Sequence, residues 1–303
     1  MKKFKLAMVF AAIFAMGLMA SSTVLAEEPI VVGGKNFTEQ YLLAEMAKIL
    51  LESNGLPVNL KTGVGSAVVR RSLINDQIDL YYEYTGTAYT VYYKKSDRSI
   101  MTDPQEVYEW VKEADAEKGL IWLPPVDFNN TYTLMMREKQ AEKLGIESIS
   151  DLSDYINENP GELVMGVNAE FWERPDGLKP LMKTYNFQIP YNKVRKMDSG
   201  LVYKALQEKN VDVSMGFATD GRIKAFGFVS LEDNKDYFPV YNPAPVVREE
   251  ILKKHPEIRD ILQPIADHLT TQEMRQLNSA VDVEHMNVQT VARQWLEKKG
   301  LLN

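Results

Sequence analysis

Cysteine is absent from all 303 residues of the sequence. Its absence excludes disulfide bonds, thiolate metal sites and a cysteine nucleophile. It also excludes the lipid anchor of a bacterial lipoprotein, because that anchor is attached to a cysteine directly after the cleavage site. We therefore expect a protein with no direct membrane anchor.

Residues and motifs of common catalytic sites are also scarce. Only three histidines occur, His255, His268 and His285, and none has metal-ligand spacing with another histidine or a carboxylate. The sequence contains neither a G-x-S-x-G nucleophile motif nor a dinucleotide-binding fingerprint. These absences predict that the protein is not an enzyme, that it binds no metal and that it needs no cofactor.

Long apolar runs are limited to the N-terminus, where residues 6–20 carry no charge and follow a lysine-rich start. Val24 and Ala26 fit a cleavage site before Glu27. The run is too short for a membrane span. Residues 1–26 are therefore predicted to be a secretory signal peptide. The expected location is the periplasm, and release into the medium is the alternative.

Positive charge is in deficit and no basic cluster occurs, since 35 Lys and Arg face 42 Asp and Glu for a formal charge of -7. Removing residues 1–26 takes away three lysines and no acidic residue, which leaves -10. Such an acidic chain argues against nucleic acid and anionic membrane as partners. The remaining 277 residues are enough for two modest domains or one large one.

Tyrosine, by contrast, is plentiful, and six of the 15 tyrosines lie between Tyr81 and Tyr93. Apolar residues alternate along residues 78–84, which predicts a half-buried strand. The Thr-Gly-Thr at 85–87 and the three-and-four spacing after it predict a tight turn and a helix. The free N–H groups of that helix would favour an anion beside the Tyr84 ring.

The first third of the chain repeats this strand-to-helix unit. Strands are expected at residues 30–32, 58–62 and 78–84, with Thr38 and Ser66 capping the helices after the first two. This order predicts an α/β fold whose parallel sheet is covered by helices. Ligands of such sheets lie beyond the carboxyl ends of the strands, where this sequence has Lys35, Ser66, Tyr84 and Thr87.

A second α/β block follows, with strands expected at 163–167 and 211–215, and a largely helical return from residue 247 to the C-terminus. This is the order expected if the second block is inserted into the first. We therefore predict a lobe 1 formed by residues 27–132 and 239–303 and a lobe 2 formed by 133–238. A ligand cleft with a hinge would lie between them.

Aromatic residues from both blocks fall at or near the predicted strand ends. An aromatic box suits a quaternary ammonium, which donates no hydrogen bonds and is held by ring faces. Cationic and hydroxyl side chains nearby would meet a carboxylate. Ordinary core packing of the rings is the alternative. The predicted ring set is Tyr84, Tyr132, Tyr203 and Phe217, and the predicted carboxylate set is Lys35, Thr87 and Arg174.

Several motifs, in order along nearly the whole chain after residue 26, resemble the osmoprotectant-binding proteins of ABC transporters. Those proteins bind glycine betaine, choline or carnitine. The motifs are Gly34-Lys-Asn-Phe-Thr-Glu-Gln40, Glu83-Tyr-Thr-Gly-Thr87, Phe128-Asn-Asn-Thr-Tyr132, Glu170-Phe with Arg174, Ala218-Thr-Asp-Gly-Arg222 and Trp295-Leu-Glu-Lys-Lys-Gly300.

This resemblance implies a two-lobed periplasmic-binding-protein fold of type II, with two parallel-rich sheets flanked by helices and a ligand cleft between the lobes. It maps an aromatic cage onto the four rings named above and carboxylate contacts onto Lys35, Thr87 and Arg174. It also implies a monomer that delivers a quaternary ammonium solute to an ABC permease with a cytoplasmic ATPase.

One position departs from the family pattern. Many members carry Asp-Ala-Tyr where this chain has Met215-Gly-Phe217. The phenyl ring keeps a π face but lacks the hydroxyl, so weaker or altered affinity for glycine betaine is predicted. Two alternatives stay open: a binding protein for another small zwitterion such as an amino acid or polyamine, and a periplasmic enzyme that acts on such a solute.

Overall fold

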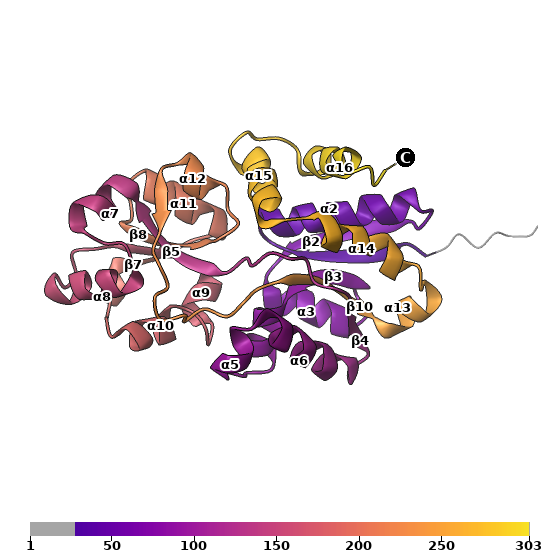
Figure 1. The fold of residues 1–303 in the computed structure, drawn as a ribbon, viewed down its shortest axis with the longest axis horizontal. Coiled ribbons are helices and arrows are strands. Elements are labelled where there is room, and N and C mark those ends of the chain that lie inside the picture. The colour runs from indigo at the N-terminus through magenta and orange to yellow at the C-terminus, as the bar shows by residue number, and fades with distance from the viewer. Residues whose placement is uncertain (1–27, 303) are drawn as a thin grey trace, which may run out of the picture.

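The computed structural model describes residues 28–302, so the predicted signal peptide lies outside the described residues. The chain forms two lobes, each built on a five-stranded sheet (Figure 1). The sheet of lobe 1 has the order β2-β1-β3-β10-β4. Its strands are β1 (Ile30–Lys35), β2 (Val58–Val64), β3 (Leu80–Tyr84), β4 (Leu120–Trp122) and β10 (Pro243–Arg248).

The sheet of lobe 2 has the order β7-β6-β8-β5-β9. Its strands all come from the chain between the two crossings that join the lobes. They are β5 (Tyr132–Arg137), β6 (Met165–Val167), β7 (Val194–Lys196), β8 (Val213–Phe217) and β9 (Phe228–Ser230).

Both sheets are mixed, not wholly parallel. In lobe 1, β1 is parallel to β2 and β3, while β10 runs antiparallel to β3 and β4. In lobe 2, β6 is parallel to β7 and β8, while β5 runs antiparallel to β8 and β9. The antiparallel strand in each sheet is the first strand after a crossing, so the two lobes share one topology.

Helices cover both faces of the lobe 1 sheet, with α2 and α16 on one side and α3 and α6 on the other (Figure 1). The helical segments of this lobe are α2 (Thr38–Ser53), α3 (Ser66–Ile74), α4 (Thr85–Thr87), the π-helix η1 (Ala88–Tyr92), α5 (Arg98–Met101), α6 (Pro104–Ala116), α13 (Glu249–Lys254), α14 (Ile258–His268), α15 (Thr271–Asp282) and α16 (Val288–Lys298).

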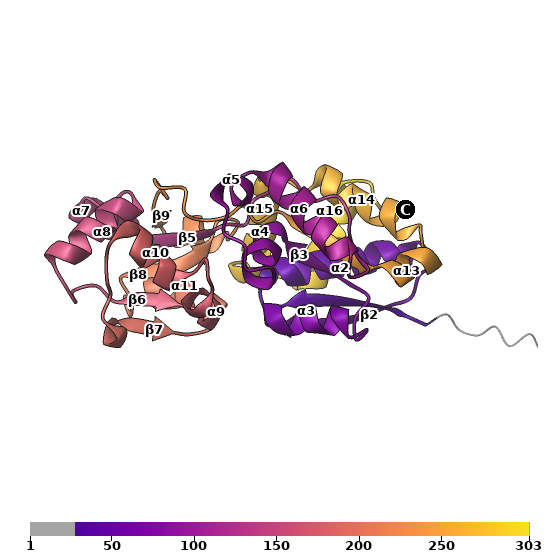
Figure 2. The same cartoon turned by 90° about the horizontal axis from the view of Figure 1, so that it is seen from below.

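Lobe 2 carries shorter helices, and α9 faces lobe 1 in both views (Figures 1 and 2). The helical segments are α7 (Glu138–Leu144), α8 (Ile149–Glu158), α9 (Ala169–Glu173), α10 (Leu178–Tyr185), the 3-10 helix η2 (Tyr191–Lys193), α11 (Ser199–Gln207) and α12 (Arg222–Ala225). Within residues 28–302, none of the helices has the length and apolar character that a membrane crossing requires.

Two predicted helix caps are wrong. Helix α2 begins at Thr38 with Phe37 as its N-cap residue, and the Thr38 hydroxyl instead donates to Asp282 at 2.6 Å. Helix α3 begins at Ser66 itself, with Gly65 as the N-cap residue. Neither side chain therefore caps its helix, and both take part in contacts around the cleft.

The chain crosses between the lobes through residues 123–131 and 231–242. Tyr132, which the sequence boundary assigns to lobe 1, is the first residue of β5 and pairs with Phe217 in the second sheet. These crossings bring the carboxyl ends of β1 and β3 opposite those of β6 and β8. The space between the lobes is therefore lined by strand ends from both sheets.

Candidate ligand-binding cleft between the lobes

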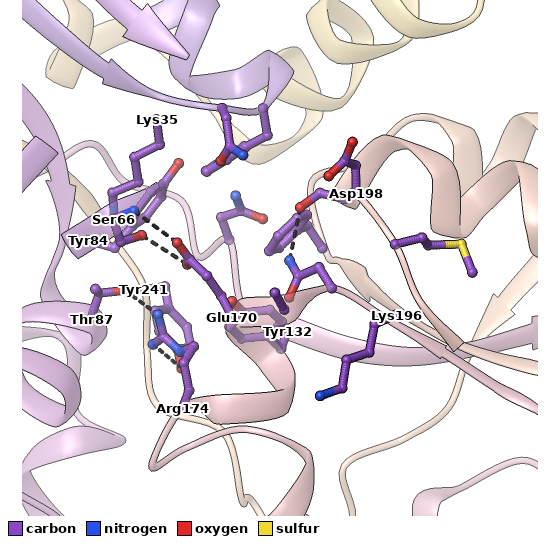
Figure 3. Close-up of a pocket in the computed structure, with 18 residues that line it drawn as sticks. Lys35, Ser66, Tyr84, Thr87, Tyr132, Glu170, Arg174, Lys196, Asp198 and Tyr241 are labelled. Carbon is purple, nitrogen blue, oxygen red and sulfur yellow. Dashed lines mark hydrogen bonds between the residues drawn. The ribbon is translucent and has the colours of Figure 1, made fainter. Parts of the chain in front are cut away.

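A cavity of about 280 Å³ lies between the lobes (Figure 3). Both lobes and both crossings contribute to its walls. The lining residues are Lys35, Asn36, Phe37, Ser66, Tyr84 and Thr87 from lobe 1, Asn130 and Tyr241 from the crossings, and Tyr132, Asn168, Ala169, Glu170, Arg174, Lys196, Met197, Asp198, Ser199 and Phe217 from lobe 2.

Six of the seven residues predicted to bind a ligand line this cavity, and Tyr203 does not. Tyr203 is fully buried on α11, where its hydroxyl accepts the backbone N–H of Phe217 at 2.9 Å. Its ring lies under the Arg222 guanidinium at 4.1 Å. Tyr203 therefore supports the strand end that carries Phe217 and forms no part of the cavity wall.

The cavity rings form one continuous array across the two lobes. Phe37 stacks on Tyr84 of lobe 1 with centroids 6.1 Å apart, and on Phe217 of lobe 2 with centroids 5.3 Å apart. Tyr132 continues the array, at 5.2 Å from Phe217 and edge-on to Tyr241 at 5.7 Å. Sequence reasoning missed Phe37 and Tyr241 as wall residues, although Phe37 lies within one of the motifs quoted above.

Strand registers explain why these rings meet. Lys35 ends β1, Tyr84 ends β3 and Phe217 ends β8, so all three side chains stand at carboxyl ends that face the cleft. Tyr132 begins the antiparallel β5 directly opposite Phe217. The alternating apolar pattern of the strands therefore delivers aromatic side chains to one place from distant parts of the sequence.

The predicted cation Lys35 is already paired inside lobe 1. Its Nζ lies 2.5 Å from Glu83 Oε1 and 4.9 Å from the centroid of the Tyr84 ring. Glu83 Oε2 accepts the hydroxyls of Tyr81 at 2.7 Å and Tyr92 at 2.8 Å. The charge of Lys35 is thus matched by a buried carboxylate before any ligand enters.

Arg174 is held at the bottom of the cleft by Asp176. Its Nε and Nη2 each donate to the Asp176 carboxylate at 2.7 Å. Nη1 makes a longer bond of 3.3 Å to the hydroxyl of Thr87 across the lobes, and no other bond from Nη1 to a described residue is present. Burial alone would raise the pKa of Asp176, but the Arg174 guanidinium holds it below its ordinary value. Both groups therefore remain charged.

Glu170 on α9 joins the lobes at another edge of the cavity. Its carboxylate accepts the backbone N–H of Ser66 at 2.9 Å and the Ser66 hydroxyl at 3.0 Å (Figure 3). Because Ser66 begins α3, this carboxylate occupies the positive end of a helix dipole. Sequence reasoning placed Ser66 at a strand end but assigned no contact to Glu170.

The wall chemistry suits a small solute with a cation and an anion. Ring faces can hold a cation without hydrogen bonds, and the guanidinium and hydroxyl groups at the bottom can hold an anion. Among residues 28–302, no group of three or more histidines or carboxylates is placed to hold a metal ion.

Comparison with known proteins gives a consistent result. The family described as the substrate binding domain of ABC-type glycine betaine transport systems matches residues 28–298. A glycine-betaine-binding protein of Pseudomonas aeruginosa is 40% identical and covers 98% of this chain and 94% of its own. The glycine betaine-binding protein YehZ of Escherichia coli is 36% identical, covering 91% of this chain and 92% of its own. A crystal structure of a glycine betaine/carnitine/choline ABC transporter matches with a TM-score of 0.72 at 27% identity, covering 90% of this chain and 100% of that one.

Proposed function

The chain belongs to the family of substrate-binding domains of ABC-type glycine betaine transport systems, and on this premise we propose a specific task for it. It captures a quaternary ammonium osmoprotectant of the glycine betaine, choline or carnitine type between its lobes. It then delivers this solute to the permease of an ABC importer that is driven by a cytoplasmic ATPase.

The observation that carries the proposal is the ring array shared by both lobes. A quaternary ammonium has no N–H to donate, so aromatic faces are the groups that bind it well. Here Tyr84 comes from one lobe while Tyr132 and Phe217 come from the other. The cage is complete only when the lobes are together, so ligand binding would favour the closed arrangement.

The anionic end of a zwitterionic ligand fits beside Arg174 and Thr87. The Nη1 group of Arg174 makes a single long bond within the described chain, to the Thr87 hydroxyl, and both residues line the cavity. Lys35 contributes less directly, because its charge is already paired with Glu83. We therefore assign the carboxylate contact to Arg174 and Thr87, and give Lys35 the task of supporting the Tyr84 wall.

The location follows from the N-terminal sequence. Residues 1–26 would direct export to the periplasm, and the absence of cysteine leaves no lipid attachment site. The protein would then act as a freely diffusing monomer that shuttles between solute and permease. Its acidic composition, with a formal charge of -7 over the whole sequence, is compatible with a protein that diffuses freely.

Calorimetric titration tests the proposal directly. Glycine betaine, choline, carnitine and proline betaine are the ligands, and arginine is the cationic control without a quaternary nitrogen. We expect saturable binding of one or more quaternary ammonium compounds, with the ligand recovered chemically unchanged. Binding of arginine alone would contradict the proposal that the rings form a quaternary ammonium cage. Chemical conversion of the ligand would favour the alternative that the protein is an enzyme.

A matched pair of variants locates the site. Tyr84→Ala removes a cage wall and should lower the affinity about 100-fold. Tyr191→Ala makes the same substitution at an exposed tyrosine that does not line the cavity, and should leave the affinity unchanged. Equal affinities for the two variants would place the ligand elsewhere.

A further inference from the structure

Glu39 is a buried carboxylate directly behind the aromatic cage. It lies on the first turn of α2 and is 2% exposed. Its Oε1 accepts the hydroxyl of Tyr84 at 2.7 Å and the side-chain amide of Asn130 at 2.8 Å. Its Oε2 accepts the hydroxyl of Thr219, in lobe 2, at 2.5 Å. One carboxylate thus gathers donors from lobe 1, a crossing and lobe 2.

This carboxylate lacks the cationic partner that the other buried carboxylates of the cleft have. Glu83 is paired with Lys35 and Asp176 with Arg174, whereas none of the ion pairs formed within residues 28–302 includes Glu39. A buried negative charge is costly without a positive neighbour. Burial accordingly raises the pKa of Glu39 from its ordinary 4.5 to about 7, even though the hydrogen-bond donors around it favour the ionised form.

The cationic groups around Glu39 are already paired with other carboxylates. Lys35, whose Nζ lies 4.9 Å from the centroid of the Tyr84 ring, is bound to Glu83. A smaller cavity of about 140 Å³ beside the cage is lined by Glu39 together with Asp220, Arg222 and Asp282. The guanidinium of Arg222 is shared between Asp220 at 2.6 Å and Asp282 at 3.2 Å, so this cluster is itself net negative. The Tyr84 hydroxyl is the titratable group bonded to Glu39, and burial raises its pKa far above the ordinary value, so it stays neutral.

The position of Glu39 behind the cage allows its unpaired charge to act on a bound cation. The carboxylate accepts the hydroxyl of Tyr84, and Tyr84 lines the ligand cavity. A phenol that donates to a carboxylate is richer in electrons, which strengthens its attraction for a cation. The carboxylate also attracts a cation in the cage through the protein interior, where screening is weak.

We propose that Glu39 is the specificity-determining carboxylate of this cleft: acting through Tyr84, it provides the negative charge for which a quaternary ammonium headgroup is the missing partner. The inference rests on the function proposed above and names what that site selects, which is positive charge and not merely a bulky trimethyl group. Glu39 does not touch the ligand, so it is a positioning residue.

The test compares Glu39→Gln with the wild-type protein, using choline and its uncharged carbon analogue 3,3-dimethylbutan-1-ol. The two ligands have the same shape, so the ratio of their affinities measures the preference for charge. We expect Glu39→Gln to lower this ratio about tenfold while changing the affinity for the alcohol little. Glu52→Gln, the same substitution on the exposed far end of α2, should leave the ratio unchanged.

Proton release on ligand binding is a second measurement, and a purely structural role of Glu39 would not produce it. A cation in the cage lowers the pKa of Glu39, so binding at pH 7 should release up to about half a proton. Titrations in two buffers of different ionisation enthalpy measure this number. The wild-type protein needs no substitution for this reading, and Glu39→Gln should release none.

The outcomes are distinct. Equal charge preference in Glu39→Gln and the wild type overturns the inference, as does choline binding to the wild type between pH 6 and 8 without proton release. If the wild type binds no quaternary ammonium compound at all, the proposed function fails and this inference fails with it. A lowered ratio together with loss of proton release supports Glu39 as the selecting charge.

Discussion

Tyr84 and Phe217 occupy equivalent places in the two lobes. Each ends the middle strand of a five-stranded sheet, β3 in lobe 1 and β8 in lobe 2, and each ring lines the cleft. What lies behind them differs. The Tyr84 hydroxyl donates to the buried Glu39, whereas Phe217 has no hydroxyl and is supported by the backbone bond to Tyr203. One topology therefore places the rings, and the side chains behind each ring set its electrostatic character.

The same contrast extends to the ion pairs. The lobe 1 wall is supported by the ion pair of Lys35 and Glu83, which lie near the ends of adjacent strands, and Glu83 also accepts the hydroxyls of two tyrosines. In lobe 2, Phe217 packs against the core of that lobe, and the ion pair at the cleft is Arg174 with Asp176. We therefore expect substitutions behind Tyr84 to alter charge and pH dependence, and substitutions around Phe217 to alter mainly contact area.

The largest effect is expected from Glu83→Gln. The change leaves the buried ammonium of Lys35 without its partner and should lower the free energy of unfolding by about 3–5 kcal/mol in urea denaturation. The control is Glu109→Gln, which breaks a half-exposed pair with Lys112 and should cost less than about 1 kcal/mol. A small loss for both would mean that the lobe 1 wall does not depend on its ion pair.

The pH dependence of stability should carry the signature of Glu39. Between about pH 4.5 and 7 the folded protein keeps the proton of Glu39 while the unfolded chain loses it. This group therefore makes the protein less stable as pH rises through that window, by up to about 3 kcal/mol, and adds no further change above it. Unfolding of the wild type at pH 5 and pH 8, minus the same difference for Glu39→Gln, isolates this contribution.

Asp176 of lobe 2 should behave in the opposite sense. Its folded-state pKa is below the ordinary 3.8, so its stabilising contribution is present above that value and disappears as pH falls through the lowered one. Wild-type protein should thus lose this contribution in acid and the variant Asp176→Asn should not. For the Glu39 prediction, if Glu39→Gln were as much more stable at pH 5 than at pH 8 as the wild type is, the pH effect would belong to other groups.

The next effect compares the two rings in ligand binding. Tyr84→Ala should lower the affinity for a quaternary ammonium compound about 100-fold, whereas Phe217→Ala should lower it about 10-fold, because Phe217 has no carboxylate behind it. Calorimetric titration of both variants measures the difference. Equal losses would show that the two walls contribute alike and that the charge behind Tyr84 is not used.

The smallest effect is expected from Phe217→Tyr. This change restores the tyrosine that many family members carry at this position. The added hydroxyl should raise the affinity for glycine betaine by a few fold. Titration against the wild type checks the sign. An unchanged or lower affinity would contradict the prediction that the missing hydroxyl weakens binding.

The sequence predicts a large part of the fold because its signals are local. Alternation along residues 78–84 predicts β3, which the structure shows as Leu80–Tyr84. The apolar spacing after Thr38 predicts helix α2, whose side chains are buried against the sheet. The antiparallel strand of each sheet was not foreseen, since its pairing depends on where the chain lands after crossing between the lobes.

The sequence predicted which residues reach the cavity better than it predicted their contacts. Strand ends placed Tyr84, Tyr132 and Phe217 at the cavity, since a strand end has a definite position in the sheet. Tyr203 lies on a helix, where a one-residue rotation of about 100° decides between cavity and core, and it faces the core. The signal for Phe37 was its position two residues after Lys35, just past the end of β1.

The sequence by itself determined the order of strands and helices, the acidic and cysteine-free chemistry of the chain, and the aromatic residues at the strand ends. Only the tertiary structure decided which charges are matched. Glu83 meets Lys35 from 48 residues away and Glu39 meets Thr219 from 180 residues away. Periodicity is encoded by neighbouring residues, whereas pairing depends on how two lobes and two crossings pack together. The unmatched charge of Glu39 is a property of that packing.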